Sequence, residues 1–231
     1  MGAGFRGRAS VLLFLAMPAF AGRPFTTEDA NVLEDKACQV ESWVNRSSDA
    51  TTGWLVPACN FGLGIQWQVG AARTREDGRS AFSEAYIQAK TVFPGAEDSP
   101  WKAGLVLGVI RLPRAPEHNG WENPAVIVPV SYFGDQWAVH VNAGSLRDRA
   151  ESRNLTLWGV AGEAKASARW TLLGEVFGEN AARPSIRLGA RFAAIKDQLD
   201  VDISAVTRPG GSREERFVSL GVAWVTGPIL P

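Results

Sequence analysis

The chain has few of the residues on which most recognisable functional sites depend. Its 231 residues include only two cysteines, two histidines and two methionines, and 24 basic residues balance 24 acidic ones. Two cysteines and two histidines leave little for a structural zinc site, so we expect no metal and no cofactor. Proteins that neutralise phosphates carry a basic excess, so a net charge of zero argues against a nucleic-acid partner.

Long apolar runs are also missing after residue 21. The first 21 residues have the features of a cleaved signal peptide: Arg6 and Arg8, an apolar run from Ala9 to Phe20, and small residues at 19 and 21. The alternative is a membrane anchor, but the run is shorter than the roughly 20 residues that a spanning helix needs. Later apolar runs, such as 103–110, are only strand-sized. The exported chain is therefore either soluble or a β-barrel.

From residue 37 onward, apolar and polar residues alternate in twelve segments. None shows the 3.6-residue apolar period of a helix. An even number of antiparallel strands of about ten residues each is typical of an outer-membrane barrel. The predicted strands cover residues 37–45, 54–61, 65–74, 82–93, 101–112, 123–133, 136–145, 154–164, 169–178, 185–194, 198–207 and 216–226.

The connections between these segments alternate in expected length. Longer polar loops are predicted at 46–53, 75–81, 113–122, 147–153, 178–184 and 208–215, and shorter turns at 62–64, 134–135, 165–168 and 196–197, with 94–100 as an exception. Long loops on one side and short turns on the other are typical of transmembrane barrels, and an even strand count leaves both termini periplasmic. We therefore predict an all-β, antiparallel up-and-down transmembrane β-barrel over residues 37–226. A periplasmic segment at 22–36 precedes it, and a tail at 227–231 follows.

The two faces of the strands differ in polarity. Ile186, Leu188 and Ala190 alternate with Arg187 and Arg191, which predicts a lipid face and a polar lumen. A soluble β-sandwich shows the same alternation with its polar side in water, and this alternative stays open. Glycines on the polar face and tryptophans near strand ends favour the barrel. Trp43, Trp54 and Trp121 would form one aromatic girdle and Trp101, Trp137, Trp170 and Trp224 the other, while Trp67 and Trp158 do not fit.

Charged and polar residues on the inner face are the candidate site. Hairpin register places Glu175 beside Arg187, and Arg191 opposite Asp202, as cross-strand ion pairs. Such pairs either stiffen the wall or orient polar solutes in the lumen. The full set of lumen candidates is Glu41, Glu84, Gln88, Lys90, His140, Glu175, Arg187, Arg191, Asp200 and Asp202.

The two cysteines lie in the first predicted hairpin. A hairpin that pairs Cys38 with Cys59 is centred between residues 48 and 49, in the middle of the loop at 46–53, and it also pairs Val40 with Pro57. Directly opposed strand residues can meet the separation that a disulfide requires, and exported proteins enter an oxidising compartment. We predict a Cys38–Cys59 disulfide; the alternative is two free cysteines on the lipid face.

Several short motifs resemble a family of Gram-negative outer-membrane proteins known as transporters, or as the MetA-pathway of phenol degradation family. Residues 22–30 (GRPFTTEDA) resemble its opening motif, and residues 37–41 (ACQVE) resemble its first strand. Residues 172–179 and 198–202 are similar to later strands. The resemblance implies an outer-membrane channel for small hydrophobic or aromatic compounds. It departs at the C-terminus, where residues 225–231 follow Trp224 in place of a terminal aromatic.

The predicted function is a channel for small solutes, monomeric in outer-membrane lipid and inserted by the barrel-assembly machinery. One alternative is a barrel that conducts nothing and acts through its loops. Another is a lipid-modifying enzyme that uses a serine and a histidine. Only His118, in a proline-rich loop, and His140, on the inner face, are available for such chemistry, and no Gly-x-Ser-x-Gly motif occurs. We therefore predict no enzymatic activity.

Overall fold

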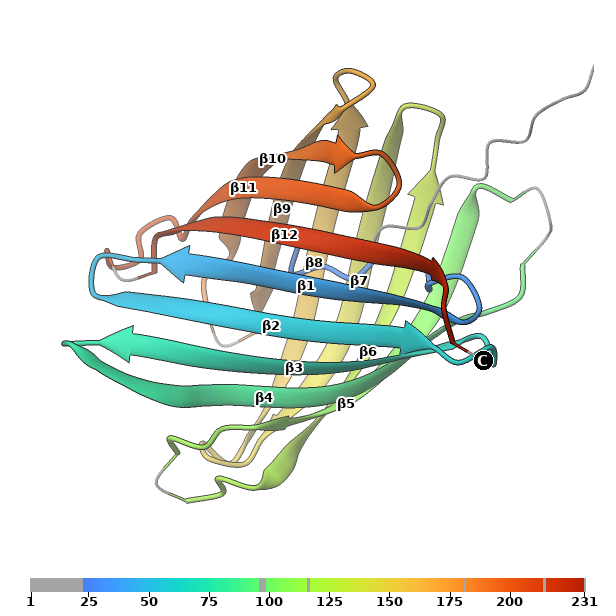
Figure 1. Ribbon diagram of the computed structural model, residues 1–231. Helices are drawn as coiled ribbons and strands as arrows, with labels where there is room; N and C mark the ends of the chain where they lie inside the picture. Colours follow the sequence, from blue (N-terminus) through green and yellow to red (C-terminus); the bar gives the residue numbers. More distant parts are fainter. Residues whose placement is uncertain (1–22, 96–98, 116, 181, 214, 231) are drawn as a thin grey trace, which may run out of the picture.

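Twelve antiparallel strands form one closed barrel in the computed structural model, which describes residues 23–95, 99–115, 117–180, 182–213 and 215–230 (Figure 1). Each strand pairs with its sequence neighbours, and the first pairs with the last. The predicted fold class is confirmed, whereas the predicted signal peptide lies outside the described residues. Within those residues no helix is long and apolar enough to cross a membrane. The strands are β1 (Ala37–Arg46), β2 (Ala50–Asn60), β3 (Ile65–Glu76), β4 (Arg79–Val92), β5 (Trp101–Arg111), β6 (Trp121–Phe133), β7 (Trp137–Asp148), β8 (Arg153–Lys165), β9 (Trp170–Glu179), β10 (Ser185–Ile195), β11 (Leu199–Thr207) and β12 (Phe217–Pro228).

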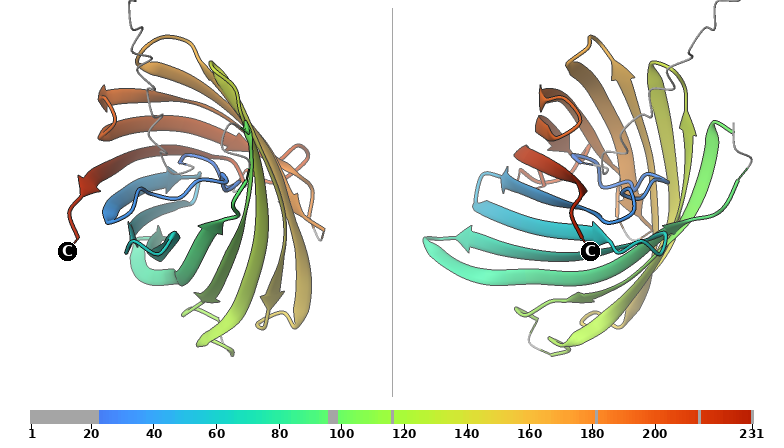
Figure 2. Two further views of the ribbon diagram at one scale, coloured as in Figure 1. Left: turned by 90° about the vertical axis from the view of Figure 1, so that its right-hand side faces the viewer. Right: turned by 45° about the vertical axis from the view of Figure 1, so that its right-hand side comes forward.

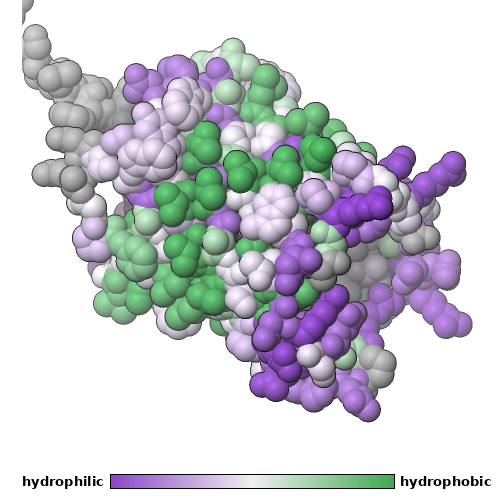
Figure 3. Space-filling view, turned by 180° about the vertical axis from the view of Figure 1, so that it is seen from behind, coloured by the Kyte–Doolittle hydropathy of each residue, from purple (hydrophilic) through white to green (hydrophobic). Residues whose placement is uncertain are grey.

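The outer surface of the barrel is apolar and the inner surface is polar. Leu188 on β10 and Leu220 on β12 are more than half exposed, whereas Arg187 and Asp202 are buried on the inner side. On the face shown in Figure 3, apolar side chains cover the middle of the surface and most hydrophilic ones gather toward one end. Because successive strand residues point to opposite faces, this arrangement follows directly from the alternation in the sequence. A single sheet closed on itself also excludes the two facing sheets of a sandwich.

Strands β5 and β6 are apolar on both faces, so their sequences alone do not orient them. The structure turns Val106 and Ser131 inward, where they are buried, and Leu107 and Val126 outward, where they are exposed. Val106 and Ile127 make part of the inner wall apolar.

Two of the predicted long loops are wrong. The β1–β2 connection is only residues 47–49, and the β3–β4 connection is the pair Asp77-Gly78. Both turn residues have positive φ, 48° and 75°, as expected of the type I′ turn that Asp-Gly favours. The strands are longer than predicted because backbone pairing continues through polar residues beyond the apolar band, as between Thr52 and Thr74. Loop length therefore does not distinguish the two ends of the barrel, and the orientation of the termini stays a prediction.

The tryptophans only partly follow the predicted girdles. Trp43 and Trp54 point into the lumen, where their rings stack with centroids 5.3 Å apart, so their assignment to a girdle is wrong. Trp43 shares the parity of Glu41, which already places it on the inner face. The other seven tryptophans are exposed: Trp67, Trp101, Trp121, Trp137, Trp158, Trp170 and Trp224.

Hydrogen bonds and apolar packing hold the end of the last strand, β12, beside the start of the first strand, β1. Strand β12 continues to Pro228, two residues beyond the predicted end of the barrel, and the backbone N–H groups of Ile229 and Leu230 donate to the Lys36 carbonyl. A small apolar cluster of Leu33, Ala37 and Ala58, with Val225 packed against it, lies at the same place. These contacts hold the start of β1 against the end of β12.

The predicted disulfide is confirmed. Cys38 and Cys59 are bonded, with a Cα–Cα distance of 4.1 Å, and they are direct partners in the β1–β2 register. The same register pairs Val40 with Pro57, as predicted. The bridge lies on the outer side of the wall, because the inner positions of β1 are taken by residues such as Gln39 and Glu41, which are buried.

Replacing Leu188 with arginine tests the assignment of the outer face. Leu188 is 67% exposed on β10, and an arginine near the bilayer midplane lowers the free energy of unfolding by about 2–4 kcal/mol. Chemical unfolding of protein refolded into lipid measures this change. Leu63→Arg, in the β2–β3 turn, is the matched control and should cost about 0–1 kcal/mol. Equal costs for the two variants would contradict the assignment.

Removing the disulfide should destabilise the barrel without changing its fold. Its closed loop of about 20 residues predicts that Cys38→Ser with Cys59→Ser lowers the free energy of unfolding by about 3 kcal/mol. Denatured, unreduced wild-type protein should react with no thiol reagent, and reduced protein should react at two sites. Two reactive thiols before reduction would refute both the bond and the β1–β2 register.

Candidate functional site

Residues 23–36, which precede β1, are called the lumen segment here; residues 23–33 lie inside the barrel, and the exposed residues 34–36 turn into β1 at its end (Figure 2). The sequence predicts a periplasmic segment at 22–36 before the barrel, and its alternation pattern gives no sign that these residues enter the lumen. The segment contacts inner-face residues from strands all round the barrel, from Asn60 on β2 to Ser219 on β12. It therefore spans the lumen from one part of the wall to another.

One side of the lumen segment is held by charged residues of β9, β10 and β11. The Arg23 guanidinium lies 2.8 Å from Asp202, and both side chains are almost fully buried. The Thr26 and Thr27 backbone N–H groups donate to one Glu175 oxygen, at 2.8 and 2.5 Å. Hydrogen bonds to charged groups are each worth about 1.5–3 kcal/mol, so these contacts hold the segment firmly.

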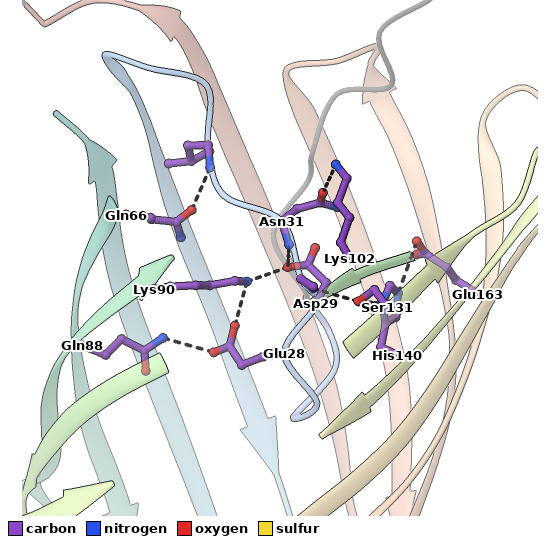
Figure 4. Close-up of polar contacts among 12 residues, drawn as sticks. Glu28, Asp29, Asn31, Gln66, Gln88, Lys90, Lys102, Ser131, His140 and Glu163 are labelled. Atoms are coloured by element: carbon purple, nitrogen blue, oxygen red, sulfur yellow. Dashed lines mark hydrogen bonds and ion pairs between the residues drawn. The ribbon is translucent and has the colours of Figure 1, made fainter. Parts of the chain in front are cut away.

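The opposite side of the segment is held by β4. Lys90 is buried and its Nζ lies 3.0 Å from Glu28 and 2.5 Å from Asp29, while the Gln88 amide donates to Glu28 (Figure 4). Closer to β1, the Leu33 N–H donates to Gln66. The single positive charge of Lys90 thus faces two carboxylates that the segment brings into the lumen.

A third set of contacts runs from the segment through β6 to β8. The Ala30 N–H donates to the Ser131 hydroxyl, which lies 2.8 Å from His140 Nδ1, and His140 Nε2 lies 3.8 Å from Glu163 (Figure 4). Since Ser131 accepts from Ala30, we assign its proton to the bond with Nδ1, which leaves the Nε2 proton facing Glu163. Serine, histidine and glutamate in this order resemble a hydrolase triad. Ser131 has no exposed surface, however, and its hydroxyl is engaged by the segment, so the chain of contacts is structural.

The two predicted cross-strand pairs have different outcomes. Glu175 and Arg187 are register partners and form an ion pair at 3.3 Å, as predicted. Arg191 and Asp202 are also register partners, but the predicted ion pair between them is wrong. Asp202 pairs with Arg23, while Arg191 lies 3.2 Å from Glu163 and donates to the Arg23 carbonyl. The lumen segment supplies partners that the strand pattern could not reveal.

A cavity of about 560 Å³ remains beside the lumen segment. Predicted residues that line it are Glu41, Glu84, Gln88, Lys90 and Arg187. The other predicted residues do not line the cavity but belong to the network of inner-face contacts near the segment: His140, Glu175, Arg191, Asp200 and Asp202. Trp43, Trp54 and Tyr86 also line the cavity and were not predicted as site residues. Trp43 lies two residues after Glu41, and Tyr86 two residues after Glu84, so each shares the inner face of its strand with a predicted lumen residue. This spacing was enough to predict that Trp43 and Tyr86 face the lumen.

One edge of the cavity is formed by the β11–β12 loop. Arg208 and Glu215 form an ion pair there, and the Ser212 N–H donates to Glu215. The Ser212 N–H and the Arg208 guanidinium lower the pKa of the Glu215 carboxyl. Both charges of this pair are therefore satisfied by each other and by the loop backbone.

Glycines on the inner face make room for the segment. A side chain at Gly159 on β8 would collide with Thr27, and one at Gly221 on β12 would collide with the Arg23 guanidinium. This gives a physical reason for glycine on the polar face. Across the part of the chain that the structure describes, no three His, Cys, Asp or Glu residues are grouped so as to hold a metal ion.

These features define a twelve-stranded barrel of the outer-membrane type with a lumen segment inside it. The chain belongs to the family described as Uncharacterised conserved protein UCP029691, whose model matches residues 10–224. This description differs from that of the family suggested by the short motifs. A search of curated proteins gives no match.

Solved outer-membrane barrels share the fold at low sequence identity. The KdgM porin is similar with a TM-score of 0.61 and 8% identity, over 80% of this chain and 98% of that chain. The COG4313 outer membrane channel from Pseudomonas putida F1 gives 0.59 and 12%, over 86% and 98%. Outer membrane phospholipase A from Escherichia coli gives 0.51 and 11%, over 92% and 96%. Channels and an enzyme share this architecture, so the fold alone does not choose between them.

Removing Glu175 should show that the buried charges depend on one another. Glu175→Ala leaves Arg187 buried without its partner and removes the acceptor of Thr26 and Thr27, so the free energy of unfolding should fall by about 3–5 kcal/mol. Chemical unfolding of the refolded protein measures it. The control is Glu76→Ala, in the exposed pair with Arg114, which should change stability by no more than about 1 kcal/mol. A loss as small as the control's would mean that Arg187 does not need Glu175.

Proposed function

We propose that the chain is an outer-membrane channel for small solutes, including hydrophobic or aromatic compounds. The observation that carries the proposal is a closed barrel with an apolar outer surface, a polar lumen and a cavity of about 560 Å³ inside it. A cavity of this volume is in the range that holds small molecules. In this proposal the chain is exported by its signal peptide, inserted by the barrel-assembly machinery, and monomeric in outer-membrane lipid.

The lumen segment is the constriction of the proposed channel. It crosses the lumen between Asp202 on β11 and Lys90 on β4, so solutes pass only when part of it shifts. Apart from the backbone that continues into β1, no covalent bond within the described residues joins it to the inner wall, and its contacts are hydrogen bonds, ion pairs and ring contacts. Such contacts can exchange for water when the segment moves, which makes a gated channel physically reasonable.

The second candidate is a barrel that conducts nothing, and the same contacts favour it. If the buried ion pairs never open, the segment is a permanent part of the core. A lipid-modifying enzyme is less well supported, because Ser131 is fully buried beneath Ala30. Electrical measurements on the whole chain separate the first two candidates.

Single-channel recording in a planar bilayer tests the channel and its constriction together. Lys90→Met leaves Glu28 and Asp29 without their cation, so the segment should leave the lumen more often. We expect discrete conductance steps from the wild-type protein and a several-fold higher mean conductance from the variant. The matched control is Lys165→Met at the end of β8, an exposed residue whose Nζ donates, among the described residues, only to the Asp135 carbonyl at 3.4 Å. It should behave as wild type.

Two results would count against the proposal. Absence of current from both wild type and Lys90→Met, in barrels shown to be folded by their resistance to protease, would support the non-conducting barrel. Conductance that is the same in both proteins would mean that the lumen segment is not the constriction.

A further inference from the structure

The cavity beside the lumen segment has an aromatic wall. Trp43 and Trp54 stack, and the Trp54 and Tyr86 rings lie 6.0 Å apart between centroids. Tyr86 lies over Gly70, where a side chain would collide with its ring. We call Trp43, Trp54 and Tyr86 the aromatic wall. The Arg23 guanidinium already lies 4.2 Å from the Trp43 ring centre, so this wall accepts a cation on a ring face.

Two acidic side chains line the same cavity without a basic partner. Glu84 lies in one cross-strand row with the aromatic wall, because Trp43 pairs with Trp54, Trp54 with Ala72 and Ala72 with Glu84. Glu41 is 6% exposed, and its Oε1 is buried with no hydrogen-bond partner. Among the described residues, neither Glu41 nor Glu84 forms an ion pair.

The basic groups that line the cavity are all engaged elsewhere. Each lies within ion-pair distance of another acid, and none lies within that distance of Glu41 or Glu84. The pairs are Arg23 with Asp202, Lys90 with Glu28 and Asp29, Arg187 with Glu175, and Arg208 with Glu215. The cavity is therefore lined by two acidic side chains, Glu41 and Glu84, that form no ion pair among the described residues and lie beside an aromatic wall.

We propose that this cavity binds a small organic cation, an amine or guanidine with an aromatic or apolar part. The cationic N–H groups would hydrogen-bond to Glu41 and Glu84, and the apolar part would contact the aromatic wall. A buried carboxyl without a partner is costly when ionised, and an incoming cation offsets that cost. The inference rests on the proposed function only in taking this cavity as the binding site of the solute.

Calorimetric titration of the detergent-solubilised full chain tests the ligand class. The probes are benzylamine, benzyl alcohol and benzoate, which share one ring and differ in charge. We expect benzylamine to bind and the other two to bind at least about tenfold more weakly, a difference of about 1.4 kcal/mol. Binding of benzyl alcohol or benzoate as tight as that of benzylamine would overturn the proposal.

Substitutions locate the site. Glu41→Gln with Glu84→Gln should weaken benzylamine binding at least about tenfold. Glu76→Gln, which lies outside the cavity, should leave binding unchanged. Both glutamines keep the shape of the side chain and remove an unpaired acid, so folding should be preserved; if the double variant does not fold, Glu84→Gln alone carries the test. Unchanged affinity in the folded variant would overturn the site.

Ion selectivity separates this inference from the proposed function. A conducting wild-type barrel should prefer cations in a salt gradient, and the double glutamine variant should lose that preference. Binding of benzylamine by a barrel without conductance would refute the channel and support the cation site. A conducting barrel that does not distinguish benzylamine from benzoate would refute the site and leave the channel standing.

Discussion

Buried charges inside the barrel need partners, and the lumen segment supplies them. Lys90 on β4 and Asp202 on β11 are separated by β12, β1, β2 and β3 along the wall, so they cannot pair with each other as strand neighbours. Leaving either one unpaired and buried costs several kcal/mol. Glu28 and Asp29 meet Lys90, and Arg23 meets Asp202. One short stretch of chain therefore balances charges on distant parts of the wall.

Other features of the inner wall follow from this arrangement. Gly159 and Gly221 leave space for Thr27 and Arg23, and Glu175 is placed to accept two backbone N–H groups of the segment as well as Arg187. A twelve-stranded barrel is wider than the eight-stranded barrels that wall side chains fill alone. Here the segment fills much of the remaining width, and the cavity is what it leaves open.

The contacts of Ser131, His140 and Glu163 show why residue types alone do not establish chemistry. The same three side-chain types form nucleophile, base and acid in hydrolases. Here Ser131 is covered by Ala30, so they transmit hydrogen bonds from the segment to the wall. By contrast, Glu41 and Glu84 lack such partners in the described residues and face the cavity with the aromatic wall. Their environment, rather than their residue type, singles them out as ligand-binding candidates.

The sequence by itself determined the barrel and its local register. Alternation with a period of two identifies which residues of β10 and β11 face inward, and hairpin symmetry pairs Cys38 with Cys59 and Glu175 with Arg187, because both depend only on neighbouring strands. The pattern overestimated the turns after β1 and β3, where polar residues continue the strand pairing. Only the tertiary structure decided that residues 23–33 enter the lumen and that Asp202 pairs with Arg23 rather than Arg191. Those contacts join positions up to 196 residues apart, and no local periodicity records which distant charges meet once the barrel closes.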